Sequence, residues 1–155
     1  MNVGVANNMR FSEPSVPVCQ LRGLHHVGFV VNSIEEVAGR FAKSIGAIWD
    51  QKTTHDPLQR VRVSFIVGGN TSLTSVELVE PAGPNSPVEH FLRRGGGLHH
   101  LCYEVDRLEH QLIFSRSIGG VIVKPPLPAA AFEGRRIAWV VTKDKLLLEF
   151  LEAAS

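Results

Sequence analysis

The order of apolar and polar residues in the first half of the chain predicts a strand, a helix and three further strands. Leu24 to Val31 is a short apolar run suited to a buried strand. Ser33 to Glu36 then carries the Ser-x-x-Glu pattern of a capping box, which opens a helix. Apolar segments bounded by turn residues predict further strands over residues 47–52, 61–67 and 72–79, with a hairpin turn at 68–70.

The second half of the chain repeats this order. A second capping box at Ser86 to Glu89 predicts a short joining helix over residues 88–94, which three consecutive glycines end. After a predicted strand over 98–105, Asp106 is placed to cap a helix that stops at Gly119. Further strands are predicted over residues 121–124, 136–142 and 146–151.

Two halves that both read β-α-β-β-β indicate an α+β fold, in which paired modules form a curved half-barrel sheet around a cleft. We expect a single domain over residues 22–152, preceded by a polar N-terminal arm over residues 1–21 that contains two prolines. Within that domain we expect module one over residues 22–82, a linker helix over 86–95 and module two over 97–152.

The tripeptide Leu-His-His occurs at the start of each half, each time after a glycine. Side chains alternate between the two faces of a strand, so the second histidine of each doublet, His26 or His100, shares its face with small or polar residues. The first histidine, His25 or His99, falls on the face that carries bulky apolar residues. We therefore expect the second histidines to face the cleft, and the first to pack or to support them.

A glutamate stands in the middle of the last predicted strand of each half, with apolar neighbours on both sides: Glu77 and Glu149. A buried carboxylate is costly unless it is paired or bound to metal. One strand histidine or glutamate alone is usually structural, but four in register across a repeat favour a shared site. Two imidazoles and two carboxylates suit Zn²⁺, Co²⁺, Ni²⁺, Mn²⁺ or Fe²⁺. We therefore predict that His26, Glu77, His100 and Glu149 bind one divalent ion.

Composition and charge narrow the partners. The 155 residues carry a formal net charge of +1 without a run of lysine or arginine, so we expect neither nucleic acid nor a membrane surface as partner. A small molecule becomes the expected ligand. No apolar run reaches the roughly 18 residues of a membrane span, and the N-terminus lacks a secretory pattern, which predicts a cytoplasmic protein. Cys19 and Cys102 are expected to be reduced thiols.

The motifs "GLHHVGFVVNSIEE", "SVELVEPAGPNSPVEHFLRRGGGLHHLCYEVDRLE" and "LLLEFLE" resemble the vicinal oxygen chelate superfamily, which includes glyoxalases, bleomycin resistance proteins and dioxygenases. Within it they resemble methylmalonyl-CoA epimerase and its glyoxalase-like relatives, over residues 22–152. The resemblance places the family's metal ligands on the same four residues and implies a homodimer. It also implies proton abstraction next to a carbonyl, with Glu149 as the best candidate for the base.

The chain departs from the epimerase pattern at one position. The resemblance places a second catalytic glutamate on the third strand, where this sequence has Val63, and the nearest carboxylate is Asp56. The sequence therefore leaves several functions open: an epimerase or isomerase acting on an acyl thioester, a glyoxalase I-like lyase, a drug-binding protein without catalysis, or an extradiol dioxygenase. Arg136, in the loop predicted over residues 125–136, is a candidate ligand for a substrate phosphate or carboxylate.

Overall fold

The computed structural model describes residues 20–68 and 74–154. The predicted N-terminal arm and the hairpin turn at 68–70 lie mostly outside these ranges. Among the described residues the elements follow one another in the predicted order of strands and helices, which confirms the α+β class. They are β1 (Leu21–Val30), α1 (Ile34–Ser44), β2 (Ala47–Trp49), β3 (Thr54–Asp56), β4 (Val61–Gly68), β5 (Ser75–Pro81), α2 (Glu89–Arg93), β6 (Gly97–Val105), α3 (Leu108–Ser117), β7 (Val121–Pro128), the 3₁₀ turn η1 (Ala130–Phe132), β8 (Arg136–Val141) and β9 (Leu147–Glu152).

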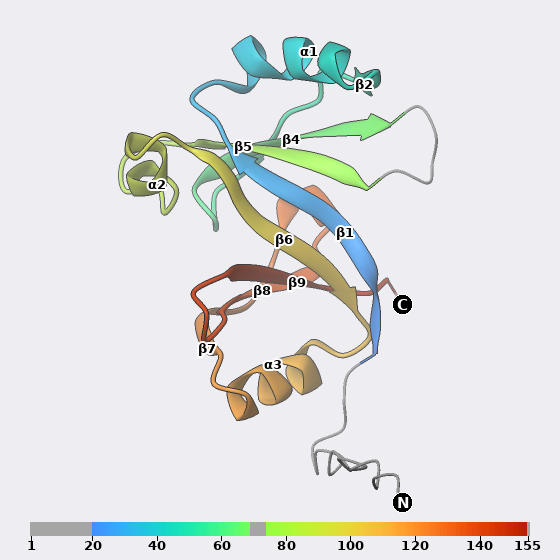
Figure 1. The fold of residues 1–155 in the computed structure, drawn as a ribbon, viewed down its shortest axis with the longest axis vertical. Helices are drawn as coiled ribbons and strands as arrows, with labels where there is room; N and C mark the ends of the chain where they lie inside the picture. Colours follow the sequence, from blue (N-terminus) through green and yellow to red (C-terminus); the bar gives the residue numbers. More distant parts are fainter. Residues whose placement is uncertain (1–19, 69–73, 155) are drawn as a thin grey trace, which may run out of the picture.

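The described strands form one mixed sheet, which does not close into a barrel. Its order is β2-β4-β5-β1-β6-β9-β8-β7, with β3 paired to β4. In each half the first strand pairs in parallel with the last, β1 with β5 and β6 with β9. The two halves meet where β1 and β6 pair antiparallel, and Figure 1 shows these two long strands crossing the middle of the molecule between α1 and α3. The four strands that carry the predicted ligands are therefore neighbours.

The strand predicted over residues 47–52 is interrupted. β2 and β3 both pair with β4, and the chain leaves the sheet between them, where Gln51 has a positive φ of 63°. Ser64 bridges the gap: its hydroxyl accepts a hydrogen bond from Trp49 Nε1 at 2.8 Å and donates one to the carbonyl of Lys52 at 2.6 Å. Together β2 and β3 thus act as one strand of the β-α-β-β-β unit.

The segment predicted as a loop over residues 125–136 is mostly ordered structure. β7 continues through Pro125 and Pro126 to Pro128, and η1 follows directly. Proline is tolerated here because β7 is the last strand of the sheet, so the missing N–H groups break no further ladder. The η1 turn then folds over the face of the sheet opposite the helices and buries Phe132.

Each long helix packs on the sheet strands of its own half. The buried residues of α1 pack against Ile66 and Leu78, and those of α3 against Val140 and Phe150. Because side chains alternate along a strand, Glu77 faces away from Leu78 and away from α1. Strand periodicity therefore directs the predicted ligands to the face that the helices leave open. No helix in the two described ranges is long and apolar enough to cross a membrane.

The helix starts agree with the predicted caps at only one of three places. Ser33 caps α1 as predicted, since its hydroxyl accepts a hydrogen bond from the N–H of Glu36 at 3.3 Å. The caps predicted at Ser86 and Asp106 are wrong, because α2 and α3 begin one to two residues later, and their N-cap residues make no side-chain cap bond. Asp106 pairs instead with Arg22, and the Ser86 hydroxyl is buried without a hydrogen-bond partner among the described residues.

Because only Ser33 caps its helix, replacing the serine by alanine should have different effects on stability in the two Ser-x-x-Glu motifs. Ser33→Ala removes a cap bond and should lower the free energy of unfolding by about 1 kcal/mol. Ser86→Ala removes a buried hydroxyl that has no partner among the described residues, so the free energy of unfolding should stay unchanged or rise slightly. Urea denaturation of the two variants measures both values, and equal losses would show that Ser86 is a cap in solution.

Candidate metal centre

The structure brings the four predicted ligand side chains together at the centre of the sheet. His26 comes from β1, Glu77 from β5, His100 from β6 and Glu149 from β9. Cross-strand register explains the convergence in each half: Gly28, two residues after His26, stands opposite both Glu77 and His100. The equivalent residue of the second half, Cys102, stands opposite both Glu149 and His26. A small residue two positions after each histidine thus leaves room for the side chains from the other strands.

The distances among His26, His100 and Glu149 suit one ion, and Glu77 stands beside the two histidines. Atoms bound to one ion at about 2.1 Å lie roughly 3.0–3.4 Å apart, depending on the coordination geometry. The Nε2 atoms of His26 and His100 are 3.1 Å apart. From His26 Nε2, the Oε2 atoms of Glu77 and Glu149 lie at 3.4 Å and 3.1 Å, and from His100 Nε2 at 3.4 Å and 3.6 Å. His26, His100 and Glu149 therefore form a group that fits a divalent ion, with Glu77 Oε2 next to both imidazoles.

Burial and mutual charge shift the pKa values of all four groups. Although burial alone would favour the neutral imidazole, Glu77 and Glu149 raise the pKa of His26 to about 10. The pKa of His100 is raised in the same way against its burial. Burial opposes ionisation of Glu77 and Glu149, but the two imidazoles outweigh it and lower both carboxyl pKa values. Two imidazolium ions and two carboxylates are neutral together, and one divalent ion with two neutral imidazoles keeps the same total charge.

Glu149 Oε2 and the two Nε2 atoms also indicate that something else belongs at the centre. Glu149 Oε2 is buried without a well-aligned hydrogen-bond donor among the described residues, although both imidazoles stand near it. The two Nε2 atoms face each other, and one proton at most can lie between them. A buried acceptor without a donor is costly, so a cation in this space would satisfy all four groups.

The first histidine of each doublet contacts the second. His25 Nδ1 lies 2.9 Å from His26 Nδ1, and His99 Nδ1 lies 3.1 Å from His100 Nδ1. The expectation that these residues point to the opposite face was wrong for His99, which lines the cavity. Burial, with the charge of the neighbouring imidazole, lowers the pKa of His25 and lowers that of His99 to about 4. Both can therefore accept a hydrogen bond from Nδ1 of the histidine that follows and fix its ring.

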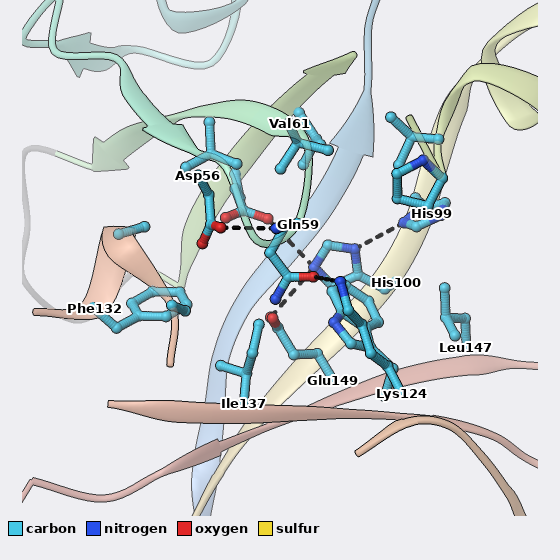
Figure 2. Close-up of a pocket in the computed structure, with 18 of the residues that line it drawn as sticks. Asp56, Gln59, Val61, His99, His100, Lys124, Phe132, Ile137, Leu147 and Glu149 are labelled. Carbon is cyan, nitrogen blue, oxygen red and sulfur yellow. Dashed lines mark hydrogen bonds and ion pairs between the residues drawn. The ribbon is translucent and has the colours of Figure 1, made fainter. Parts of the chain in front are cut away.

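A cavity of about 290 Å³ opens above the four groups, and Figure 2 shows the side chains that surround it. Most of its wall is apolar. Glu77, His99, His100 and Glu149 reach it from the sheet. Three other polar side chains also reach it: Asp56 from the end of β3, Gln59 from the turn before β4 and Lys124 from β7. The apolar lining residues include Val61, Val63, Val79, Val88, Phe132, Ile137, Trp139 and Leu147.

Two residues of the cavity wall bear on acid/base chemistry. Val63 is buried in the wall, so β4 presents no carboxylate there. Asp56 does reach the cavity, but its Oδ1 accepts a hydrogen bond from the N–H of Gln59 at 2.8 Å and its Oδ2 one from Ala130 at 3.0 Å. Asp56 thus joins two backbone segments and has both oxygens occupied.

Arg136 lies away from this cavity. Its guanidinium donates hydrogen bonds to the carboxylates of Glu109 and Glu152. Arg136 is not one of the described residues that line the cavity. The neighbouring Arg135 donates to Glu104 at 2.9 Å. Strand alternation accounts for this placement, because Ile137, the next residue of β8, points into the cavity instead.

Sequence reasoning missed Gln59, Lys124 and Phe132 as parts of the site. Phe132 stacks on the ring of His26 at a centroid distance of 5.8 Å. All three residues lie in turns or on an edge strand, where no periodicity marks the inward side.

Gly28 is a position that the sequence could have pointed to, because a glycine inside a strand often marks a place where another group approaches the backbone closely. A Cβ atom on Gly28 would lie 2.0 Å from Cε1 of His100.

The fold and site are those of paired βαβββ modules around a central cluster of histidines and glutamates, and sequence comparison gives them a family. The sequence profile of the Glyoxalase/Bleomycin resistance protein/Dioxygenase superfamily matches residues 25–139. The chain belongs to this superfamily, as its motifs predicted.

Three proteins that are similar to the chain are epimerases of malonyl-CoA derivatives. Mouse mitochondrial methylmalonyl-CoA epimerase is 35% identical over 118 residues, which are 70% of this chain and 63% of that protein. The ethylmalonyl-CoA/methylmalonyl-CoA epimerase of Cereibacter sphaeroides is 29% identical over 123 residues, covering 78% and 89%. The crystal structure of methylmalonyl-CoA epimerase from Mycobacterium tuberculosis superposes with a TM-score of 0.74 at 25% identity, covering 87% of this chain and 90% of that one. The chain thus spans less than two thirds of the mouse protein.

The contact between Gly28 and His100 predicts a specific loss of metal affinity. Gly28→Ala must displace the imidazole of His100, so its affinity for Co²⁺ should fall about tenfold or more. Gly39→Ala in α1 is the matched control, because its Cβ would meet Trp49 only at 3.8 Å, and this variant should bind Co²⁺ like the wild type. Calorimetric titration measures both affinities; an unchanged Gly28→Ala variant would show that His100 is not a ligand.

Proposed function

We propose that this protein is a divalent-metal-dependent epimerase that acts at a carbon next to a thioester carbonyl, in the manner of a methylmalonyl-CoA epimerase. The observation that carries the proposal is a buried set of four groups: Glu77, His100 and Glu149 line the floor of a largely apolar cavity, and His26 lies directly behind His100. The two epimerases that are 35% and 29% identical support the reaction class. A cytoplasmic location and a homodimer remain predictions.

The four residues would hold the metal ion, with His25 and His99 fixing the two imidazole rings. A divalent ion bound there polarises a carbonyl oxygen and stabilises the negative charge that develops on it when the neighbouring carbon loses a proton. The apolar wall excludes water from the carbanion-like carbon, which protects it from stray protons.

Glu149 is our candidate for the base. Its side chain is buried in the cavity floor, and a carboxylate there can take the α-proton through the oxygen that does not face the imidazoles. The lowered pKa of Glu149 keeps the carboxylate ionised, as a general base must be, although it also weakens the base. Cys102 lies beside it as a buried thiol whose pKa is raised, chiefly by burial, so it stays protonated.

One observation favours a second candidate function. Epimerisation needs a proton delivered to the face opposite the base, but Val63 occupies the expected acid position and both oxygens of Asp56 are bonded to backbone amides. A glyoxalase-type isomerisation moves a proton on one face with a single base and so needs no second carboxylate. We therefore keep this reaction as the alternative.

Metal analysis and one substitution test the leading proposal. Protein purified without chelator should contain about one divalent ion per chain. Glu149→Gln should lower the rate of methylmalonyl-CoA epimerisation by about 100-fold or more, because general base catalysis contributes at least that factor. Glu152→Gln on the same strand is the control, since Glu152 pairs with Arg136 outside the cavity. Metal content measured on each variant separates loss of the base from loss of the ion, and an active Glu149→Gln variant that retains its metal would contradict the assignment.

The two candidate reactions differ in products. The epimerase is expected to invert the stereocentre of (R)- or (S)-methylmalonyl-CoA in D₂O with incorporation of deuterium. A glyoxalase-type enzyme should instead convert the hemithioacetal of methylglyoxal and a thiol into a thioester, with no inversion of methylmalonyl-CoA. Parallel assays by NMR and by ultraviolet absorbance separate them. Metal-free protein that is inactive in both assays, yet stabilised against heat by a drug, would instead support a binding protein.

A further inference from the structure

The cavity contains a polar pair that the metal chemistry does not use. Gln59 reaches in from the turn between β3 and β4, and Lys124 from β7, as Figure 2 shows. Lys124 Nζ donates a hydrogen bond to Gln59 Oε1 at 2.7 Å and another to the carbonyl of Leu58 at 3.2 Å.

Lys124 fixes which way the carboxamide of Gln59 points. An ammonium group only donates hydrogen bonds, so it must face Oε1, and Nε2 must point to the other side. That nitrogen is buried without a hydrogen-bond partner among the described residues, and Gln59 as a whole is only 8% exposed. A buried donor with no acceptor is unfavourable, so this N–H group calls for an acceptor that enters with a ligand.

The backbone of Gln59 is held as firmly as its side chain. Asp56 Oδ1 accepts a hydrogen bond from the N–H of Gln59, while Oδ2 accepts one from Ala130 and so ties this turn to η1 on the other half of the chain. Both oxygens of Asp56 are used in this bridge. The donor of Gln59 is therefore preorganised, as a recognition group needs to be.

The charge of Lys124 identifies the kind of acceptor. Burial lowers the pKa of Lys124, and a negative group beside it would offset that shift. An amide donor next to an ammonium group suits a carboxylate, which can accept one hydrogen bond from each. The charge of Asp56 already raises the pKa of Lys124 in part, but its oxygens accept two backbone bonds, so neither serves the Nε2 donor of Gln59.

The distance between the Gln59–Lys124 pair and the metal centre determines how far apart the two polar groups of the ligand must be. Lys124 stands opposite Trp139, and Trp139 opposite Glu149, so the lysine and the glutamate lie in one row, two strands apart. Their backbones are about 10 Å apart at the usual strand spacing. A ligand between them could place one oxygen at the metal centre and a carboxylate oxygen at Gln59.

We propose that Gln59, held by Lys124, recognises a free carboxylate of the substrate and so selects malonyl-type thioesters over simple acyl thioesters. This inference rests on the proposed function for the thioester, but the carboxylate site itself can be measured by binding alone. Gln59 acts here as a specificity-determining residue, while Lys124 and Asp56 are positioning residues.

Binding of two small acids to the Co²⁺-loaded protein tests the site. The wild type should bind methylmalonate about tenfold more tightly than propionate, whose one carboxylate is taken by the metal centre. Gln59→Leu should lose about tenfold for methylmalonate and less than twofold for propionate. Gln59→Glu keeps an acceptor for Lys124 but replaces the donor by a charge, so it should lose more. Gln111→Leu is the control: Gln111 is buried in α3 beside Ser115 and lies outside the described cavity lining.

Three results would overturn the carboxylate site: no preference of the wild type for methylmalonate, an equal loss for both acids in Gln59→Leu, or wild-type selectivity in a folded, metal-loaded Gln59→Glu variant. Calorimetry gives the affinities, and metal content with circular dichroism shows that each variant is intact. Failure of the proposed function has a different signature. If the preference for methylmalonate depends on Gln59 but the protein does not epimerise methylmalonyl-CoA, the proposed reaction is contradicted and the carboxylate site is still supported.

Discussion

The structure depends on the cost of burying two carboxylates and two imidazoles where its halves meet. Side chains in this cluster are almost completely removed from water, and each would be unfavourable alone. They lie on four adjacent strands, β5, β1, β6 and β9, and each histidine contacts the glutamate of the other half as well as that of its own. The attraction between Glu77, Glu149 and the two histidines therefore helps to fix the register in which β1 pairs with β6.

The same constraint explains the repeated features of the sequence. Each doublet supplies one histidine for the centre and one neighbour that holds its ring, which is a compact way to fix both the tautomer and the orientation of a ligand. Each small residue two positions later, Gly28 or Cys102, makes room for the histidine of the other half. Symmetry ends at the cavity wall, where unrelated turns contribute the polar groups.

The bottom of the cavity is built from the two repeated halves, whereas its wall is built from segments that are not repeated. These two parts of the cavity contribute differently to function. Groups on the floor set the chemistry that is possible, and the wall decides which molecule is placed over it. Val63, where the resemblance to the epimerases places a glutamate, belongs to this wall. In this protein the distinctive part of the wall is Gln59 with Lys124, which the turn before β4 and the edge strand β7 bring together.

The sequence by itself determined the α+β class, most strands, both long helices and the four central residues, because local periodicity and an internal repeat encode them. It did not reveal the break after Trp49, the missing caps at Ser86 and Asp106, or the outward direction of Arg136. Those depend on partners distant along the chain, such as Ser64, Arg22 and Glu109. Only the tertiary structure could show that Nε2 of Gln59 has no hydrogen-bond partner among the described residues, because its neighbours in space come from distant parts of the chain.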